Sequence, residues 1–121
     1  MIFTINGIIR GGKNHIGITR TGRRYPLKNW AKWRDQVVAE LWRQALGEKI
    51  LDKPCHFIAN YWKGDRRKRD VPAMLDSLYH CFERAGVVKD DSLFEGVTWV
   101  PRGYDKINPR VVVEIRLMGE N

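Results

Sequence analysis

Strands and helices alternate along this chain, and that alternation constrains its fold more than any other feature. Apolar residues recur at helical spacing in two segments and form short β-rich runs in four others. We expect strands at 2–9, 55–62, 93–100 and 110–117, and helices at 27–46 and 70–86. The order β-α-β-α-β-β predicts an α/β (α+β) domain, with a mixed sheet of about four strands packed against two main helices.

The length of the chain sets the scale of the fold. At 121 residues it has the size of one domain, so a single domain over 1–121 is expected. Residues 10–25 contain four glycines and five cations with little apolar periodicity. We expect a long mobile loop there, and loops of this length are usually functional.

Positive charge is concentrated near the start of the chain. The formal net charge is +8, and no acidic residue precedes Asp35. The cations before that residue are Arg10, Lys13, Arg20, Arg23, Arg24, Lys28, Lys32 and Arg34. A pole of one sign attracts a polyanion, and nucleic acid is the commonest such partner; a contribution to solubility alone is the alternative.

No targeting or membrane-spanning segment is evident in the sequence. The first residues resemble a strand rather than a signal peptide, and no apolar run approaches the roughly 20 residues needed to cross a bilayer. Cys55 and Cys81 are too few, and wrongly spaced, for a zinc site or a disulfide framework. We therefore expect a cytoplasmic protein whose two thiols are reduced.

Acidic residues follow the basic block 66–69 at two points. Asp70 marks the start of the second expected helix, and Asp90 and Asp91 directly precede the next strand. Acids at these two places would converge if that strand ran beside the strand leading into the helix. Clustered carboxylates hold hard divalent ions such as Mg²⁺, whereas cations hold a phosphate backbone. The combination indicates a metal-dependent nuclease, although Asp70 taken alone would be a helix N-cap.

The segment 65–91 resembles RusA-type Holliday junction resolvases. The resemblance rests on the basic run, the aspartate at a helix start and the run AGVVKDDS before a strand, and it extends to the order of elements. It implies a small bacterial or phage enzyme, often prophage-encoded, of DNA recombination and repair. It also implies a homodimer that nicks four-way junctions symmetrically with Mg²⁺, or Mn²⁺ in its place, held by aspartates. Asp70 and Asp91 match the family's essential aspartates, and Asp90 lies beside the second.

The chain departs from the family pattern in two respects. Pro72 and Ala73 stand where the family usually has Asp-Asn, and Asp76 stands where it usually has lysine. Helical side chains lean toward the N-terminus, so Asp76 could reach a metal held by Asp70, and we infer a relocated ligand. His80, one turn later, is either a proton carrier behind the metal ligands or a surface histidine. The expected catalytic and metal-binding set is Asp70, Asp76, Asp90 and Asp91.

Three functions stay open at this point. The first is the junction-resolving endonuclease, and the second is a catalytically inactive, nucleic-acid-binding relative. The third is a DNA-binding regulator, which the acidic residues oppose because unliganded carboxylates repel phosphate. The DNA-binding residues expected are Lys13, Arg20, Arg23, Arg24, Arg66, Arg67, Lys68 and Arg69.

Overall fold

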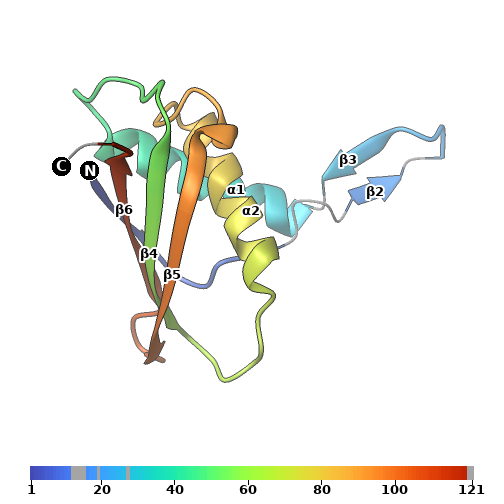
Figure 1. Cartoon of the computed structure of the whole chain (residues 1–121). Helices are drawn as coiled ribbons and strands as arrows, with labels where there is room; N and C mark the ends of the chain where they lie inside the picture. Colours follow the sequence, from blue (N-terminus) through green and yellow to red (C-terminus); the bar gives the residue numbers. More distant parts are fainter. Residues whose placement is uncertain (12–15, 19, 27, 120–121) are drawn as a thin grey trace.

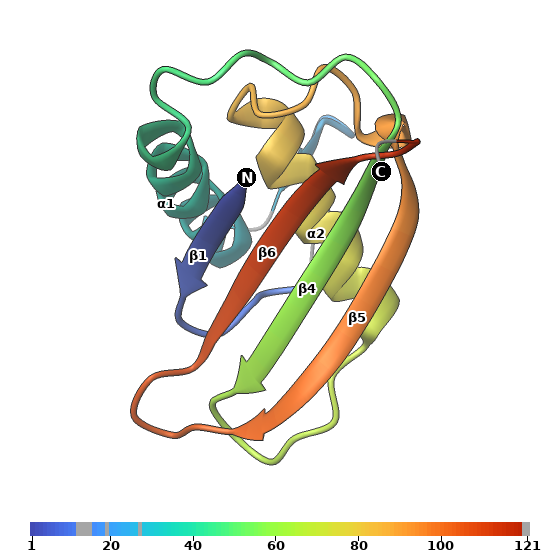
Figure 2. The same ribbon diagram turned by 60° about the vertical axis from the view of Figure 1, so that its left-hand side comes forward.

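The structure is a computed structural model that describes residues 1–11, 16–18, 20–26 and 28–119, with the backbone alone at 16–18 and 24–26. Two α-helices cover one face of a four-stranded sheet (Figures 1 and 2). The sheet contains β1 (Ile2–Asn6), β4 (Cys55–Lys63), β5 (Phe94–Tyr104) and β6 (Arg110–Leu117), and the helices are α1 (Lys28–Gln44) and α2 (Val71–Arg84). The expected fold class, a mixed sheet of four strands with two main helices, is confirmed.

The strands lie in the order β1-β6-β4-β5. β4 pairs with β5 in parallel, whereas β6 is antiparallel to both of its neighbours, β1 and β4. The chain reaches β5 from β4 by crossing over the sheet through α2. Because a crossover helix runs against the strands it joins, α2 begins at the carboxyl end of β4 and ends near the start of β5 (Figure 2).

The core forms where α2 packs on the central strands. Alternate residues of β4 point inward, and the apolar stripe of α2 recurs at helical spacing, as its sequence pattern predicts. Phe82 is fully buried, and its ring meets the edges of Phe3 at 5.2 Å and Phe57 at 5.5 Å between centroids. These contacts join β1, β4 and α2 into one apolar layer.

Local sequence fixes both ends of α2. Asp70 is the N-cap, and its Oδ1 accepts a hydrogen bond from the Ala73 N–H at 3.2 Å. Pro72 lies in the first turn, where a missing N–H costs nothing. Gly86, with φ of 78°, follows the helix in the left-handed conformation that favours glycine. A 3₁₀ turn, η1 (Asp91–Leu93), then leads into β5.

The expectation of a loop over 10–25 is wrong at two short strands and right at the other residues of that range that the structure describes. β2 (Ile16–Ile18) and β3 (Arg24–Pro26) form an antiparallel pair that projects from the body of the protein (Figure 1). Strands of three residues are too short to show an alternating pattern, and the abundant glycine and charge concealed them. The part of that expectation that falls on 12–15 and 19 lies outside the described residues.

Candidate functional site

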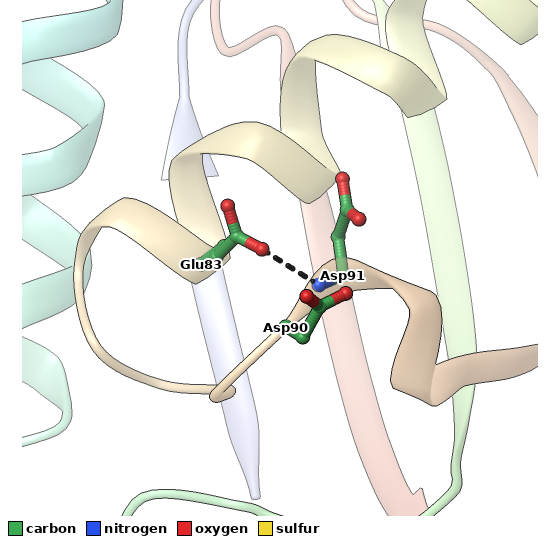
Figure 3. A group of neighbouring side chains, drawn as sticks. All are labelled: Glu83, Asp90 and Asp91. Atoms are coloured by element: carbon green, nitrogen blue, oxygen red, sulfur yellow. Dashed lines mark hydrogen bonds between the residues drawn. The ribbon is translucent and has the colours of Figure 1, made fainter.

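Three carboxylates gather at the C-terminal end of α2. They belong to Glu83 in the last turn of the helix, and to Asp90 and Asp91 in the segment that returns to the sheet (Figure 3). One oxygen from each lies within 4.8 Å of the other two. We call Glu83, Asp90 and Asp91 the acidic cluster.

Backbone hydrogen bonds hold the acidic cluster in place. Oε1 of Glu83 accepts a hydrogen bond from the Asp91 N–H at 2.9 Å, and Oδ1 of Asp90 accepts one from the Ser92 N–H at 2.8 Å. The hydrogen bonds from Ser92 lower the pKa of Asp90. Burial, together with the nearby Asp91 carboxylate, raises the pKa of Tyr79. The cluster is therefore ordered, and Asp90 is held in its ionised form.

The acidic cluster suits a hard divalent cation. Mg²⁺ takes oxygen ligands at about 2.0–2.1 Å, so two ligands on opposite sides of one ion lie roughly 4.2 Å apart. The 4.8 Å span of the cluster needs only a small closure to meet that limit. Asp90 is exposed, and Glu83 and Asp91 are half-buried, which leaves room for the waters that Mg²⁺ retains. These residues could hold such an ion.

A cationic cleft lies at the opposite end of α2. It has a volume of about 750 Å³, and Asp70 lies on its wall. The charged residues that line it are Arg10, Lys28, Asp65, Arg67, Lys68, Arg69 and Asp70. Arg69 forms an ion pair with Asp65, while its Nε is buried without a hydrogen-bond partner among the described residues. Five cations against two acids make this cleft suitable for an anionic ligand.

Within one chain, the structure does not bring Asp70 together with Asp90 and Asp91. Asp70 caps the first turn of α2, and the acidic cluster adjoins its last turn. At about 1.5 Å per residue, the thirteen residues from Asp70 to Glu83 span roughly 20 Å. β5 does lie beside β4, as the expectation required, but the two strands are parallel. The crossover helix α2 runs antiparallel to both, so its start and the start of β5 lie at opposite ends of the sheet. The prediction that these acids converge did not take the direction of α2 into account.

Asp76 and His80 occupy the middle of α2. Asp76 lies six residues after Asp70 and seven before Glu83, so roughly 9 Å and 10 Å along the axis separate it from them. It does not belong to the acidic cluster. The His80 ring packs against Trp30 of α1 at 5.6 Å between centroids, and its Nε2 is buried. His80 therefore lies at the interface between the helices rather than on an open surface.

The expected DNA-binding residues fall into two groups. Arg66, Arg67 and Lys68 are exposed in the segment before α2, next to the half-buried Arg69. Arg20 and Arg23 are exposed between β2 and β3. The side chain of Arg24 and all of Lys13 lie outside the described residues. The structure adds Arg10 and Lys28 as cations of the cleft.

Comparison with known proteins finds a similar enzyme. No model of a known protein family matches the chain. Over 84 residues, the chain is 34% identical to the crossover junction endodeoxyribonuclease RusA of Aquifex aeolicus (strain VF5). Over that segment, the chain is similar to a RusA-type enzyme. The match covers 69% of this chain and 65% of the relative, which is slightly less than two thirds of the relative's length.

This similarity bears out the resemblance to RusA-type resolvases that was inferred from the basic run and the AGVVKDDS segment. By its name, the relative cuts DNA at crossover junctions. Among the described residues, no helix is long and apolar enough to cross a membrane.

The site contains one residue that was not expected, Glu83. Taken alone, a glutamate in the last turn of a helix is usually a solvated surface residue, so the sequence did not single it out. The sequence signal for Glu83 was its position seven residues after Asp76, because that spacing places both residues on the same side of α2. Only the path of residues 85–90 brings Asp90 and Asp91 back to it.

Proposed function

We propose that this protein is a Mg²⁺-dependent, structure-selective endodeoxyribonuclease that resolves four-way DNA junctions by paired symmetric nicks. In this role it would serve DNA recombination and repair, in the cytoplasm of a bacterium or under phage control. The observation that carries the proposal is a carboxylate cluster suited to a hard cation at one end of α2, with a cationic cleft at the other. The RusA relative supports DNA junctions as the substrate class.

The distance between the two ends of α2 favours a homodimer as the active form. A separation of roughly 20 Å prevents Asp70 and the acidic cluster of one chain from acting on the same phosphate group. A twofold axis perpendicular to α2 would set two copies of the helix antiparallel. The start of one helix would then lie beside the end of the other. Asp70 of each copy could in this way join Glu83, Asp90 and Asp91 of its partner.

Such a dimer would have two centres related by symmetry, which paired nicking of a four-armed substrate requires. Asp76, in the middle of α2, would lie close to the twofold axis. It could act there as the relocated ligand expected from the sequence, or maintain the spacing between the two helices.

In each centre, some side chains would bind the metal ion or the DNA, and others would take part in the reaction. Glu83, Asp90 and Asp91 would hold the Mg²⁺ ion. When bound, the ion supplies an activated water and charge relief on the leaving oxygen. Arg67, Lys68 and Arg69 would hold the phosphates on either side of the cut. Asp70 has one oxygen bound to the Ala73 N–H, and its second oxygen can orient the attacking water.

A labelled synthetic four-way junction tests this proposal. We expect purified protein to nick two opposed strands at symmetric positions when Mg²⁺ or Mn²⁺ is added, and to bind the junction without cutting it when EDTA is present. A linear duplex of the same sequence should remain uncut. Binding without cleavage in either metal, or equal cutting of the linear duplex, would contradict the proposal.

One observation favours a catalytically inactive, DNA-binding protein as the second candidate. Pro72 and Ala73 leave the first turn of α2 without the acid and amide that the family usually has there. Ala73 also lies against Gly11, where an added Cβ would approach the Ala73 Cβ to 3.0 Å, so a longer residue at 73 would displace the segment over the cleft. The cleavage experiment decides between the two candidates.

A further inference from the structure

A nearly fully exposed aliphatic side chain stands at the tip of the connection between β5 and β6. Ile107 is 96% exposed, more than any other large apolar residue that the structure describes. Its neighbours in the chain are Lys106 and Asn108, and both are exposed. An isoleucine left in water forgoes the free energy that burial of its side chain would provide, so contact with a partner at this position would be stabilising.

The loop that carries Ile107 is held firmly from inside. Asp105 accepts hydrogen bonds from the Asn108 N–H and from Nη1 of Arg110, both at 3.0 Å. The backbone N–H of Asp105 donates to the Lys63 carbonyl at 2.9 Å. The Arg110 guanidinium also stacks over Trp62, 4.0 Å from the ring centroid. Ile107 is thus presented on an ordered turn.

The loop is also tied to the segment that leads into the cationic cleft. Pro109 packs so closely on Gly64 that a Cβ added to Gly64 would lie 2.8 Å from the proline ring. The Gly7 N–H donates to the Pro109 carbonyl at 2.8 Å. The β5–β6 and β4–α2 connections accordingly lie at the same end of the molecule (Figures 1 and 2). The loop that carries Ile107 is therefore anchored to Gly64, which directly precedes Asp65 on the wall of the cleft.

The surroundings of Ile107 are cationic and aromatic. Lys106 precedes it, and Arg66 of the basic block lies over the exposed ring of Tyr104, 5.6 Å from its centroid. Cations beside an exposed apolar side chain suit a partner that has a negative exterior and a flat apolar interior. Nucleic acid has this chemistry, since phosphates flank stacked bases.

We propose that Ile107 enters the base stack at the branch point of a DNA junction, while Lys106 and Arg66 hold the flanking phosphates. This inference rests on the proposed function, and it specifies how the protein would engage branched rather than continuous DNA. An apolar wedge must unstack bases, which costs free energy. That cost is lowest at a branch point, because the strands already change direction there.

Junctions that carry 2-aminopurine at each branch-point position test the wedge, because the fluorescence of this base rises when it is unstacked. The protein is added without divalent metal, so that it binds without cutting, and anisotropy of a dye on one arm measures affinity in the same sample. We expect wild-type protein to raise the fluorescence at one branch-point position at least about twofold. Ile107→Ala should lose most of that rise, and Ile107→Leu should keep it.

Ile50→Ala is the matched control. Ile50 is also exposed, at 59%, but it lies in the connection after α1, away from the cleft. It should behave like the wild-type protein in both measurements. Anisotropy and circular dichroism establish that each variant binds and is folded.

Each outcome has a separate meaning. Junction binding by Ile107→Ala with an undiminished fluorescence rise would overturn the wedge and leave the proposed function intact. Failure of the wild-type protein to bind the junction would overturn both. A change in sedimentation of Ile107→Ala would mean that the loop contacts a second copy of the chain instead of DNA, and would also overturn the wedge.

Discussion

Glu83 and Asp91 are joined by a hydrogen bond of 2.9 Å from the Asp91 backbone N–H to the Glu83 carboxylate. The bond closes the connection from α2 to β5 and holds the three carboxylates of the acidic cluster within 4.8 Å of one another. A single glutamate thus has two functions. It positions the returning chain through one oxygen, and it can offer the other to a metal ion.

Glu83→Gln should separate these two functions. The amide oxygen of glutamine can still accept the Asp91 N–H, so the turn and the melting temperature should change little. Loss of the charge should weaken Mn²⁺ binding by about 10- to 100-fold, as measured by calorimetry, with cleavage shifted to higher metal concentration. Glu95→Gln, which removes an exposed acid from β5 outside the cluster, is the control. Unchanged metal affinity in Glu83→Gln would exclude it as a ligand.

Asp70→Asn and Asp91→Asn should each abolish cutting while preserving binding. Either change keeps the size and hydrogen-bonding capacity of the side chain but removes a negative charge. We expect the nicking rate to fall by more than about a hundredfold, a barrier increase of roughly 2.7 kcal/mol. Junction affinity, measured by anisotropy, should persist or rise because a charge that repels phosphate has gone. Wild-type cleavage by Asp70→Asn would remove that residue from the site.

A mixture of these two inactive variants tests whether each centre is shared between two chains. In a mixed dimer with centres of this kind, one centre carries both substitutions and the other carries neither. Random exchange makes half of the dimers mixed, so about a quarter of all centres should be active and should produce single nicks. Continued inactivity after confirmed subunit exchange would mean that each centre lies within one chain. Sedimentation that shows only monomer, with cleavage intact, would reject the homodimer.

Variants of Asp76 test whether its carboxylate replaces the acid that is absent at Pro72 or takes no part in the catalytic centre. If its carboxylate serves the centre, Asp76→Asn should slow nicking as severely as Asp70→Asn, and Asp76→Lys should do the same. If Asp76 is only a helix residue, both variants should stay within about tenfold of wild type, near 1.4 kcal/mol in barrier height. Full activity of both variants would leave Asp70, Glu83, Asp90 and Asp91 as the acidic residues of the site.

Binding should depend on salt through both groups of cations. Each phosphate neutralised on a duplex arm contributes about 0.9 to the slope of log affinity against log salt concentration. Replacing Arg23, Arg24, Arg66 and Arg67 with alanine should therefore flatten the slope by up to about 3.6 for each chain bound to the junction, and weaken binding to all sequences. Lys49→Ala with Lys53→Ala removes two exposed cations after α1 and should leave the slope unchanged. An unaltered slope in the fourfold variant would move the binding surface elsewhere.

The sequence predicted the fold best where one strong signal marked each boundary. The strand expected at 110–117 has those bounds in the structure, because alternation of Val111, Val113 and Ile115 is unbroken. Asp70 and Gly86 likewise marked the two ends of α2. The β2–β3 pair could not be predicted because its strands are only three residues long. The strand expected at 93–100 extends to Tyr104 in the structure, because β4 pairs with it as far as Lys63.

The site was less predictable than the fold, for a physical reason. A sequence shows which acids are available but not which end of a crossover helix each one reaches. The expected grouping of Asp70 with Asp91 needed the direction of α2, and Glu83 needed the path of the six residues before Asp91. Both depend on tertiary structure, whereas the caps and the apolar stripe of α2 are local.

The position of β6 between β1 and β4 has a consequence for how the protein folds as it is synthesised. β1 is joined to the sheet only through β6, with Ile2 opposite Glu114 and Asn6 opposite Arg110. The first strand therefore has no place to dock on the sheet until nearly the whole chain has been synthesised, and pairings so distant in sequence form slowly. Residues 8–11 follow β1 and line the cationic cleft, so they cannot take their places in the cleft before β1 has docked. A nascent chain would possess its acidic residues well before its cationic cleft was complete.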